Sequence, residues 1–340
     1  MRSSRTAMTS RTATLATVIV VIVVGGAIGG YYLLSKSPTN TSSSSGSSTV
    51  IQVVAGENFW GSLVSQLGGA HVNVTSIVSD PNTDPHEYES NPANAIAITN
   101  ARFVIVNGAG YDTWALDILS AENTPNQVVL NVQELINQSV GANPHFWYSP
   151  YYVNDTVAAM YKDLVKIDPA DESYFHQQYA DLNASLWQSY MSQEAYIRQN
   201  FGGTTTLAPD GSMDYCTGKC TPVASTESIF LYMANATGLL VVSPSAFMAA
   251  VAEGNDPPAA SVAQFENLLQ GGNTSVRVLV YNEQTVTPLT QTIKAEAAQY
   301  QIPIIGVTET IQPVTFTFQE WMQSEVGNLI NALNAAQLGQ

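Results

Sequence analysis

The sequence predicts an α/β fold of two lobes, each built on a mainly parallel four-stranded sheet with flanking helices and joined by a long rigid helix. Two observations predict it. From residue 50 onward, short apolar runs alternate with longer stretches of helical period, which is typical of parallel sheets covered by helices. A stretch at 151–200 without strand signals separates two such alternating halves.

The first half contains four apolar runs that indicate strands, with helical stretches between them. We expect these strands at 50–55, 72–78, 103–107 and 128–132. The helices are expected at 58–67 and 91–100. Because strands and helices alternate along the chain, this half predicts one parallel sheet.

Two helices are expected in the middle of the chain, at 151–167 and at about 170–200. A helix of about 30 residues spans roughly 45 Å, which is longer than a small domain needs. It could lie on the surface of one lobe, but we favour a rigid spine between two lobes because alternation resumes beyond it. The later strands are expected at 222–225, 239–243, 276–281 and 302–307, with helices at 228–237, 261–269, 288–300 and 316–336.

The N-terminal 35 residues have the pattern of a membrane segment. Arg2, Arg5 and Arg11 precede an uncharged run at 13–34, about the length that crosses a bilayer. Basic residues on this side predict a cytoplasmic N-terminus and lobes outside the cell. We favour a retained anchor over a cleavable signal peptide, whose apolar core is usually shorter.

The predicted organisation has five parts. A membrane anchor or signal segment (1–35) is followed by a flexible Ser/Thr-rich linker (36–49), an N-terminal lobe (50–168), a linking helix (169–200) and a C-terminal lobe (201–340). Linkers of this composition cannot bury a core. The expected location is therefore the cell surface, with the lobes tethered to the membrane.

Composition narrows the class of partner. Charged residues make up 11% of the chain, and the formal net charge is −16. Nucleic acid is excluded as a partner because phosphate binding needs clustered Lys and Arg. In an exported protein, the Asn-x-Ser/Thr sequons favour surface glycosylation over chance; they start at Asn40, Asn73, Asn137, Asn154, Asn183, Asn235 and Asn273.

Two cysteines, Cys216 and Cys220, stand in the run Cys-Thr-Gly-Lys-Cys. Outside the cell a local disulfide is favoured over a metal clip, since a zinc site would need two more nearby ligands.

Two histidines occupy matched positions in the first half. The motif Asp-Pro-His-Glu (84–87) follows the second predicted strand, and Asn-Pro-His (143–145) follows the fourth. The chain has four histidines in all, and each preceding proline stiffens the backbone beside the imidazole. This pairing indicates a metal site that takes His86 and His145 from separate loops.

Two carboxylates occupy similar positions in the second half. Glu227 follows the strand at 222–225, and Glu309 follows the strand at 302–307. Ligands of parallel α/β sheets bind beyond the carboxyl ends of strands. Two imidazoles and two carboxylates suit zinc, manganese or ferrous iron. Glu283 is the alternative to Glu309, or a group that orients a histidine N–H.

The motifs resemble a known family when taken in order. They are Asp-Pro-His-Glu-Tyr-Glu (84–89), Asn-Pro-His-Phe-Trp (143–147) and Thr-Glu-Ser-Ile-Phe-Leu-Tyr (226–232). They resemble the metal-binding solute-binding proteins of zinc and manganese ABC importers, the zinc-uptake complex component A family, over about residues 50–336. The resemblance implies two α/β lobes linked by a rigid helix, with one metal between them.

The resemblance also maps the metal ligands onto His86, His145, Glu227 and Glu309. Glu227 stands where many members have histidine and so resembles the manganese-type members. Glu309 stands where an aspartate is usual. The identity of the metal, zinc or manganese, therefore stays open.

The expected function is extracellular capture of a divalent transition metal and its delivery to an ABC permease in the membrane by a monomer that catalyses no reaction. Three alternatives stay open. The chain could bind another small solute through its histidines, or be a structural surface protein without metal. It could also be a zinc hydrolase, although the sequence contains no His-Glu-x-x-His helix.

Overall fold

The computed structural model describes residues 50–122, 124–208, 213–272 and 275–338. The predicted anchor and linker, 1–35 and 36–49, lie outside the described residues. Among the helices that are described, none has the length and apolar character needed to cross a membrane. The described residues form one compact unit.

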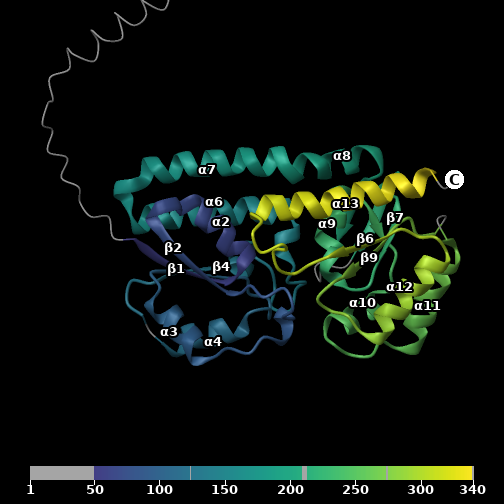
Figure 1. Ribbon diagram of the computed structural model, residues 1–340, viewed down its shortest axis with the longest axis horizontal. Coiled ribbons are helices and arrows are strands. Elements are labelled where there is room, and N and C mark those ends of the chain that lie inside the picture. Colours follow the sequence, from purple (N-terminus) through teal and green to yellow (C-terminus); the bar gives the residue numbers. More distant parts are fainter. Residues whose placement is uncertain (1–49, 123, 209–212, 273–274, 339–340) are drawn as a thin grey trace, which may run out of the picture. The chain divides into compact units, whose positions relative to one another are not determined.

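The first sheet has the order β2-β1-β3-β4, and all its strand pairs are parallel. Its strands are β1 (Ile51–Glu57), β2 (Val72–Val78), β3 (Phe103–Val106) and β4 (Val128–Asn131). Helices α2 (Asn58–Gly68) and α6 (Pro150–Ile167) lie on one side, and α3 (Pro92–Asn100) and α4 (Thr113–Ala121) lie on the other (Figure 1).

Both faces of this sheet are buried, as is usual for a parallel sheet. Along β1, Val53 and Ala55 pack into the cluster that contains Phe59 of α2. Val54 points the other way and packs with Ile98 of α3. The alternation follows from the two-residue period of a strand.

The second sheet repeats this design with the order β10-β9-β7-β8 and parallel pairs. Its strands are β7 (Pro222–Ser225), β8 (Leu240–Val241), β9 (Leu279–Asn282) and β10 (Ile304–Val307). The helices of this half are α9 (Leu231–Thr237), α10 (Ser245–Ala252), α11 (Ala259–Gln270), α12 (Pro288–Gln299) and α13 (Phe318–Leu338). The predicted fold class is confirmed.

A long helical rod runs beside α13 across both sheets (Figure 1). It comprises α7 (Glu172–Leu186), a π-helical turn (Trp187–Met191) and α8 (Ser192–Asn200), and a 3₁₀ turn (Pro169–Asp171) leads into it. The π turn was not predicted, because its sequence keeps a helical period. One hydrophobic cluster extends from the first sheet through this helix layer to the second sheet, so burial holds the two halves together.

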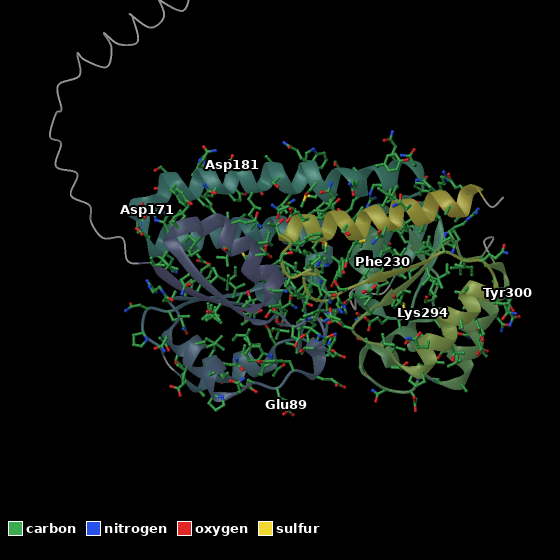
Figure 2. The ribbon with its side chains drawn as sticks, in the orientation of Figure 1. Glu89, Asp171, Asp181, Phe230, Lys294 and Tyr300 are labelled. Atoms are coloured by element: carbon green, nitrogen blue, oxygen red, sulfur yellow. A yellow bond between two sulfur atoms is a disulfide. The ribbon has the colours of Figure 1, made fainter. Side chains whose placement is uncertain are left out.

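Many charged side chains lie at the periphery, although six acidic side chains among the described residues are buried, and the aromatic core is enclosed. Glu89, Asp171 and Asp181 project outward in Figure 2, while Phe230 lies inside. Phe230 is fully buried, as is Trp321 of α13. This segregation is the expected result of burying apolar area.

Several elements were missed by the sequence analysis. Besides α4 and α10, these are the short helix α5 (Val132–Leu135) and an antiparallel hairpin of β5 (Gly203–Leu207) and β6 (Met213–Gly218). The hairpin strands are rich in Thr and mostly partly or fully exposed, so they lack the apolar alternation that indicates a strand.

The two cysteines form a disulfide, Cys216–Cys220, which confirms the interpretation favoured from sequence. The bridge lies against β5 where Gly203 begins the strand. A Cβ on Gly203 would lie 2.4 Å from Thr217 O and 2.9 Å from Cys220 Sγ. Only glycine fits this close approach.

Replacing both cysteines by serine is expected to lower the free energy of unfolding by up to about 2 kcal/mol, because the bridge closes a short loop. Metal affinity should not change, since the hairpin contributes none of the predicted ligands. Urea unfolding and a metal titration of the double variant measure the two effects. A changed Kd would show that the hairpin acts on the site.

Candidate metal centre

His145 is fully buried at the turn between β4 and α6. Its Nδ1 lies 2.6 Å from Asn143 Oδ1, while Asn143 Nδ2 donates to Ser228 O at 2.9 Å. With its amide nitrogen engaged there, Asn143 presents an oxygen to the imidazole, which assigns the proton to Nδ1. The lone pair of Nε2 is thereby free to bind a metal. Nε2 has no hydrogen-bond partner among the described residues.

The loop that carries His145 is held by hydrogen bonds to both halves of the molecule. Asn107, at the end of β3, donates to Pro144 O at 2.8 Å and accepts from Trp60 Nε1 at 3.2 Å. Tyr232 of α9 donates to Asn143 O at 2.9 Å. These contacts fix the imidazole before any ligand arrives, which lowers the entropic cost of binding.

His86 lies in a 3₁₀ turn (Pro85–Glu87) beyond β2. Asp84 caps this turn by accepting from His86 N at 2.9 Å, and Pro85 restricts the backbone. The side chain of His86 is 22% exposed, and its Nε2 lies 3.4 Å from Glu309 Oε2. Unlike His145, this imidazole is partly open to solvent.

Glu227 and Glu309 follow β7 and β10 and are both fully buried. Asn282, the last residue of β9, donates through Nδ2 to Oε1 of both carboxylates. Tyr111 donates to Glu309 Oε2 at 2.7 Å. Glu227 Oε2 has no hydrogen-bond partner within the described parts of the chain.

The four predicted ligands therefore approach one another from four strand ends. His86, His145 and Glu309 place ligand atoms within 4.8 Å of one another. Glu227 is outside that triad but shares the Asn282 amide with Glu309. Two neutral imidazoles and two carboxylates form a donor set that suits a divalent transition metal.

The electrostatics of the site favour a cation. Burial raises the pKa of Glu227 well above its ordinary value, and the charge of Glu309 raises it further. Burial likewise raises the pKa of Glu309, while nearby His86 opposes this change. Burial lowers the pKa of His145 well below its ordinary value, so the imidazole is neutral. A divalent cation would offset both the repulsion between the carboxylates of Glu227 and Glu309 and the hydration that they lose on burial.

Glu283 does not reach the site, so its predicted role as an alternative or orienting group is wrong. The side chain is exposed, accepts from Tyr281 at 3.3 Å, and lies against Gly306. Neighbouring side chains of a strand point to opposite faces. The side chain of Asn282 therefore points toward the site, and that of Glu283 points away from it.

Sequence reasoning missed Asn282, Gln284 and Tyr111. Gln284 Oε1 accepts from Glu309 N at 2.7 Å and Thr310 N at 3.0 Å, and its Nε2 donates to Thr83 O at 2.8 Å. The loop of Glu309 is thus tied to the loop that precedes His86. The position of Asn282 at a strand end was the available signal, but an amide is common in loops.

A buried acid lies behind Glu309. Glu325 of α13 accepts from Tyr148 OH at 2.6 Å, Thr308 N at 2.9 Å and Trp321 Nε1 at 2.9 Å. Burial raises its pKa to about 7, although these hydrogen bonds act in the opposite direction. The network fixes the strand end that carries Glu309.

Because the pKa of Glu325 is higher in the folded chain than in the unfolded chain, folding binds a proton. The contribution of this proton to the free energy of unfolding is fully present below about pH 4.5. It falls by up to about 3 kcal/mol as the pH rises through about 7. Thermal unfolding in a chelator should therefore depend less on pH for Glu325→Gln than for the unchanged chain. Glu134→Gln, at an exposed carboxylate, is the control. Equal pH dependence of all three would contradict this assignment.

The sequence and the fold were both compared with those of known proteins. Residues 53–201 match the family described as zinc-uptake complex component A, periplasmic. The resemblance to this family is confirmed. The match covers the first sheet and the helical rod, including the motifs of His86 and His145.

Two curated proteins similar to this chain also carry names that describe metal binding. A manganese-binding lipoprotein, MntA, of Halalkalibacterium halodurans is 31% identical over 124 residues, which are 35% of this chain and 40% of the relative. A putative metal-binding protein of Treponema pallidum is 23% identical over 180 residues, 46% of this chain and 57% of the relative. The chain spans about half the length of these relatives.

Solved structures extend the likeness to both lobes. The manganese-bound periplasmic metal-binding protein of Candidatus Liberibacter asiaticus covers 83% of this chain and 99% of its own, with a TM-score of 0.65 and 14% identity. A ZnuA crystal structure has a TM-score of 0.63 and 19% identity, and covers 84% of this chain and 99% of its own. At these identities the likeness shows the fold alone.

Proposed function

We propose that the chain is an extracytoplasmic solute-binding protein that captures zinc or manganese between its two sheets and delivers the ion to an ABC permease. His86, His145, Glu227 and Glu309 are the proposed ligands. The observation that carries the proposal is the buried Nε2 of His145, which has no hydrogen-bond partner among the described residues. Leaving a buried acceptor unpaired costs about 1–3 kcal/mol, and a metal bond removes that cost.

The metal is cargo, and the proposed role includes no catalysis. All four donors are protein side chains, whereas a catalytic zinc needs an open position for water or substrate. The hydrogen bonds from Gln284 to Thr83 and from Asn143 to Ser228 join the two halves around the ligands. They support a site that encloses its ion.

The relatives named above support the choice of metals and the location. One relative is a manganese-binding lipoprotein, and the matched family is described as periplasmic. We propose that residues 1–35 anchor this chain and that residues 36–49 tether its lobes near the permease. A flexible tether of about 14 residues has an r.m.s. span near 20 Å.

The test is a competitive titration of metal-free protein with zinc and manganese at constant pH. We expect one equivalent of either ion to bind, with protons released as the carboxyls ionise. Zinc should bind more tightly, because nitrogen and oxygen donor sites generally favour zinc over manganese. Transport assays with the permease would then identify the cargo. Absence of stoichiometric binding would overturn the proposal.

A further inference from the structure

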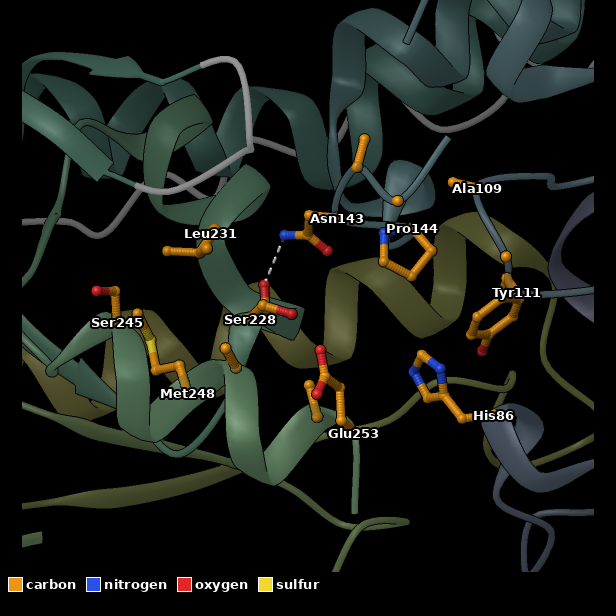
Figure 3. A pocket seen from close by; sticks show the side chains of 15 residues that line it. His86, Ala109, Tyr111, Asn143, Pro144, Ser228, Leu231, Ser245, Met248 and Glu253 are labelled. Atoms are coloured by element: carbon orange, nitrogen blue, oxygen red, sulfur yellow. Dashed lines mark hydrogen bonds between the residues drawn. The ribbon is translucent and has the colours of Figure 1, made fainter. Parts of the chain in front are cut away.

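A cavity of about 360 Å³ opens between the two halves beside the proposed ligands. Its lining includes His86 and Tyr111 from the first half, and Ser228, Met248 and Glu253 from the second (Figure 3). Of the four proposed ligands, His86 is the one that lines it. The cavity and the set of four proposed ligands therefore share a single side chain, that of His86.

The other three ligands are sealed from solvent. His145, Glu227 and Glu309 are each 0% exposed, whereas the side chain of His86 is 22% exposed. An ion that enters from this cavity therefore meets His86 first among the four proposed ligands. The cavity in front of His86 is a path toward the buried donors.

The size of the cavity fits a hydrated ion. At about 360 Å³, the cavity is many times larger than the roughly 10–15 Å³ that one water needs. A divalent ion with an octahedral shell of about six waters fits this space. Asn143, Ser228 and Ser245 supply polar groups to the lining, and Met248 and Leu231 supply apolar ones.

Two carboxylates flank the cavity. Glu253 lines it at the end of α10. Glu87, next to His86, has Oε1 3.9 Å from the position that a Cβ on Gly254 would occupy. One acid therefore comes from each half, and both are exposed. Negative charges that line a concave surface attract cations and raise the rate at which these cations associate.

We propose that this cavity is an entrance vestibule, in which a hydrated divalent cation is held before it exchanges its waters for the buried ligands past His86. The inference rests on the proposed function and adds a transient cation site in which Glu253 and Glu87 attract the ion. The vestibule controls the rates of binding and release. It leaves the equilibrium affinity to the four ligands.

The test is stopped-flow measurement of zinc and manganese binding to the full chain. Ala249→Phe fills the vestibule from α10, and Ala246→Phe adds the same bulk at an exposed position of that helix outside the lining. We expect Ala249→Phe to lower both kon and koff by at least about 10-fold while Kd stays within about 2-fold, because narrowing a path alters rates alone. Ala246→Phe should change neither rate.

A second variant tests the charge without changing the volume. Glu253→Gln should lower kon several-fold at low ionic strength and weaken its salt dependence, since salt screens long-range attraction. Asp117→Asn, at an exposed acid of α4, should not. Unchanged rates in both Ala249→Phe and Glu253→Gln would overturn the vestibule, and so would a fall in the affinity of Ala249→Phe at unchanged koff. If the unaltered chain binds no metal at equilibrium, the proposed function fails first.

Discussion

Replacing His145 by alanine is expected to raise the Kd of the bound metal by more than about 100-fold, beyond the 10- to 100-fold typical of losing a residue that only orients a ligand. The imidazole is fully buried, and Asn143 holds it with Nε2 free. Its removal deletes one of the four proposed donors. Isothermal titration of metal-free protein with zinc and with manganese measures the loss.

The matched control is His176→Ala, which removes an exposed imidazole from α7. We expect its Kd and its thermal unfolding to equal those of the unchanged chain. A His145→Ala protein that is folded and binds metal with unchanged affinity would remove this residue from the site.

Replacing Asn282 by alanine is expected to raise Kd by about 10- to 100-fold, the range for residues that orient metal ligands. The Asn282 amide donates to both Glu227 and Glu309. Without it, the two carboxylates lose their common donor while the charge of Glu309 still disfavours ionisation of Glu227. Metal-free protein should also lose about 1–3 kcal/mol of stability.

Asn331→Ala, at an exposed position of α13, is the control for Asn282→Ala. Titration calorimetry gives the change in affinity, and urea unfolding in a chelator gives the change in stability. A loss of stability with unchanged Kd would show that Asn282 supports the fold without positioning the ligands.

Much of the fold was predictable because burial imposes simple patterns. The strand at 72–78 and the strand at 222–225 were predicted at the bounds that the structure shows. The strand at 72–78 is rich in β-branched residues, and the strand at 222–225 is a short run with an apolar centre. The hairpin β5–β6 was not predicted because its strands lack the apolar alternation that indicates a strand, although cross-strand pairing joins them.

The site was predictable where the topology determines it. His86, His145, Glu227 and Glu309 follow strands, and parallel strands bring their carboxyl ends together. Glu283, the alternative to Glu309, does not reach the site, because the direction of a side chain depends on its position relative to the end of strand β9. The entrance cavity was not predictable at all. It depends on the packing of α10, a helix that the sequence pattern did not indicate.

The most direct test of the proposed metal centre is anomalous X-ray diffraction from crystals of the metal-loaded protein, recorded on both sides of the absorption edge of the bound metal. We expect one strong anomalous peak per chain, bonded to His86 Nε2, His145 Nε2 and the carboxylates of Glu227 and Glu309, at about 2.0–2.2 Å if the ion is zinc. No peak at these side chains, or a peak bonded to other residues, would contradict the assignment.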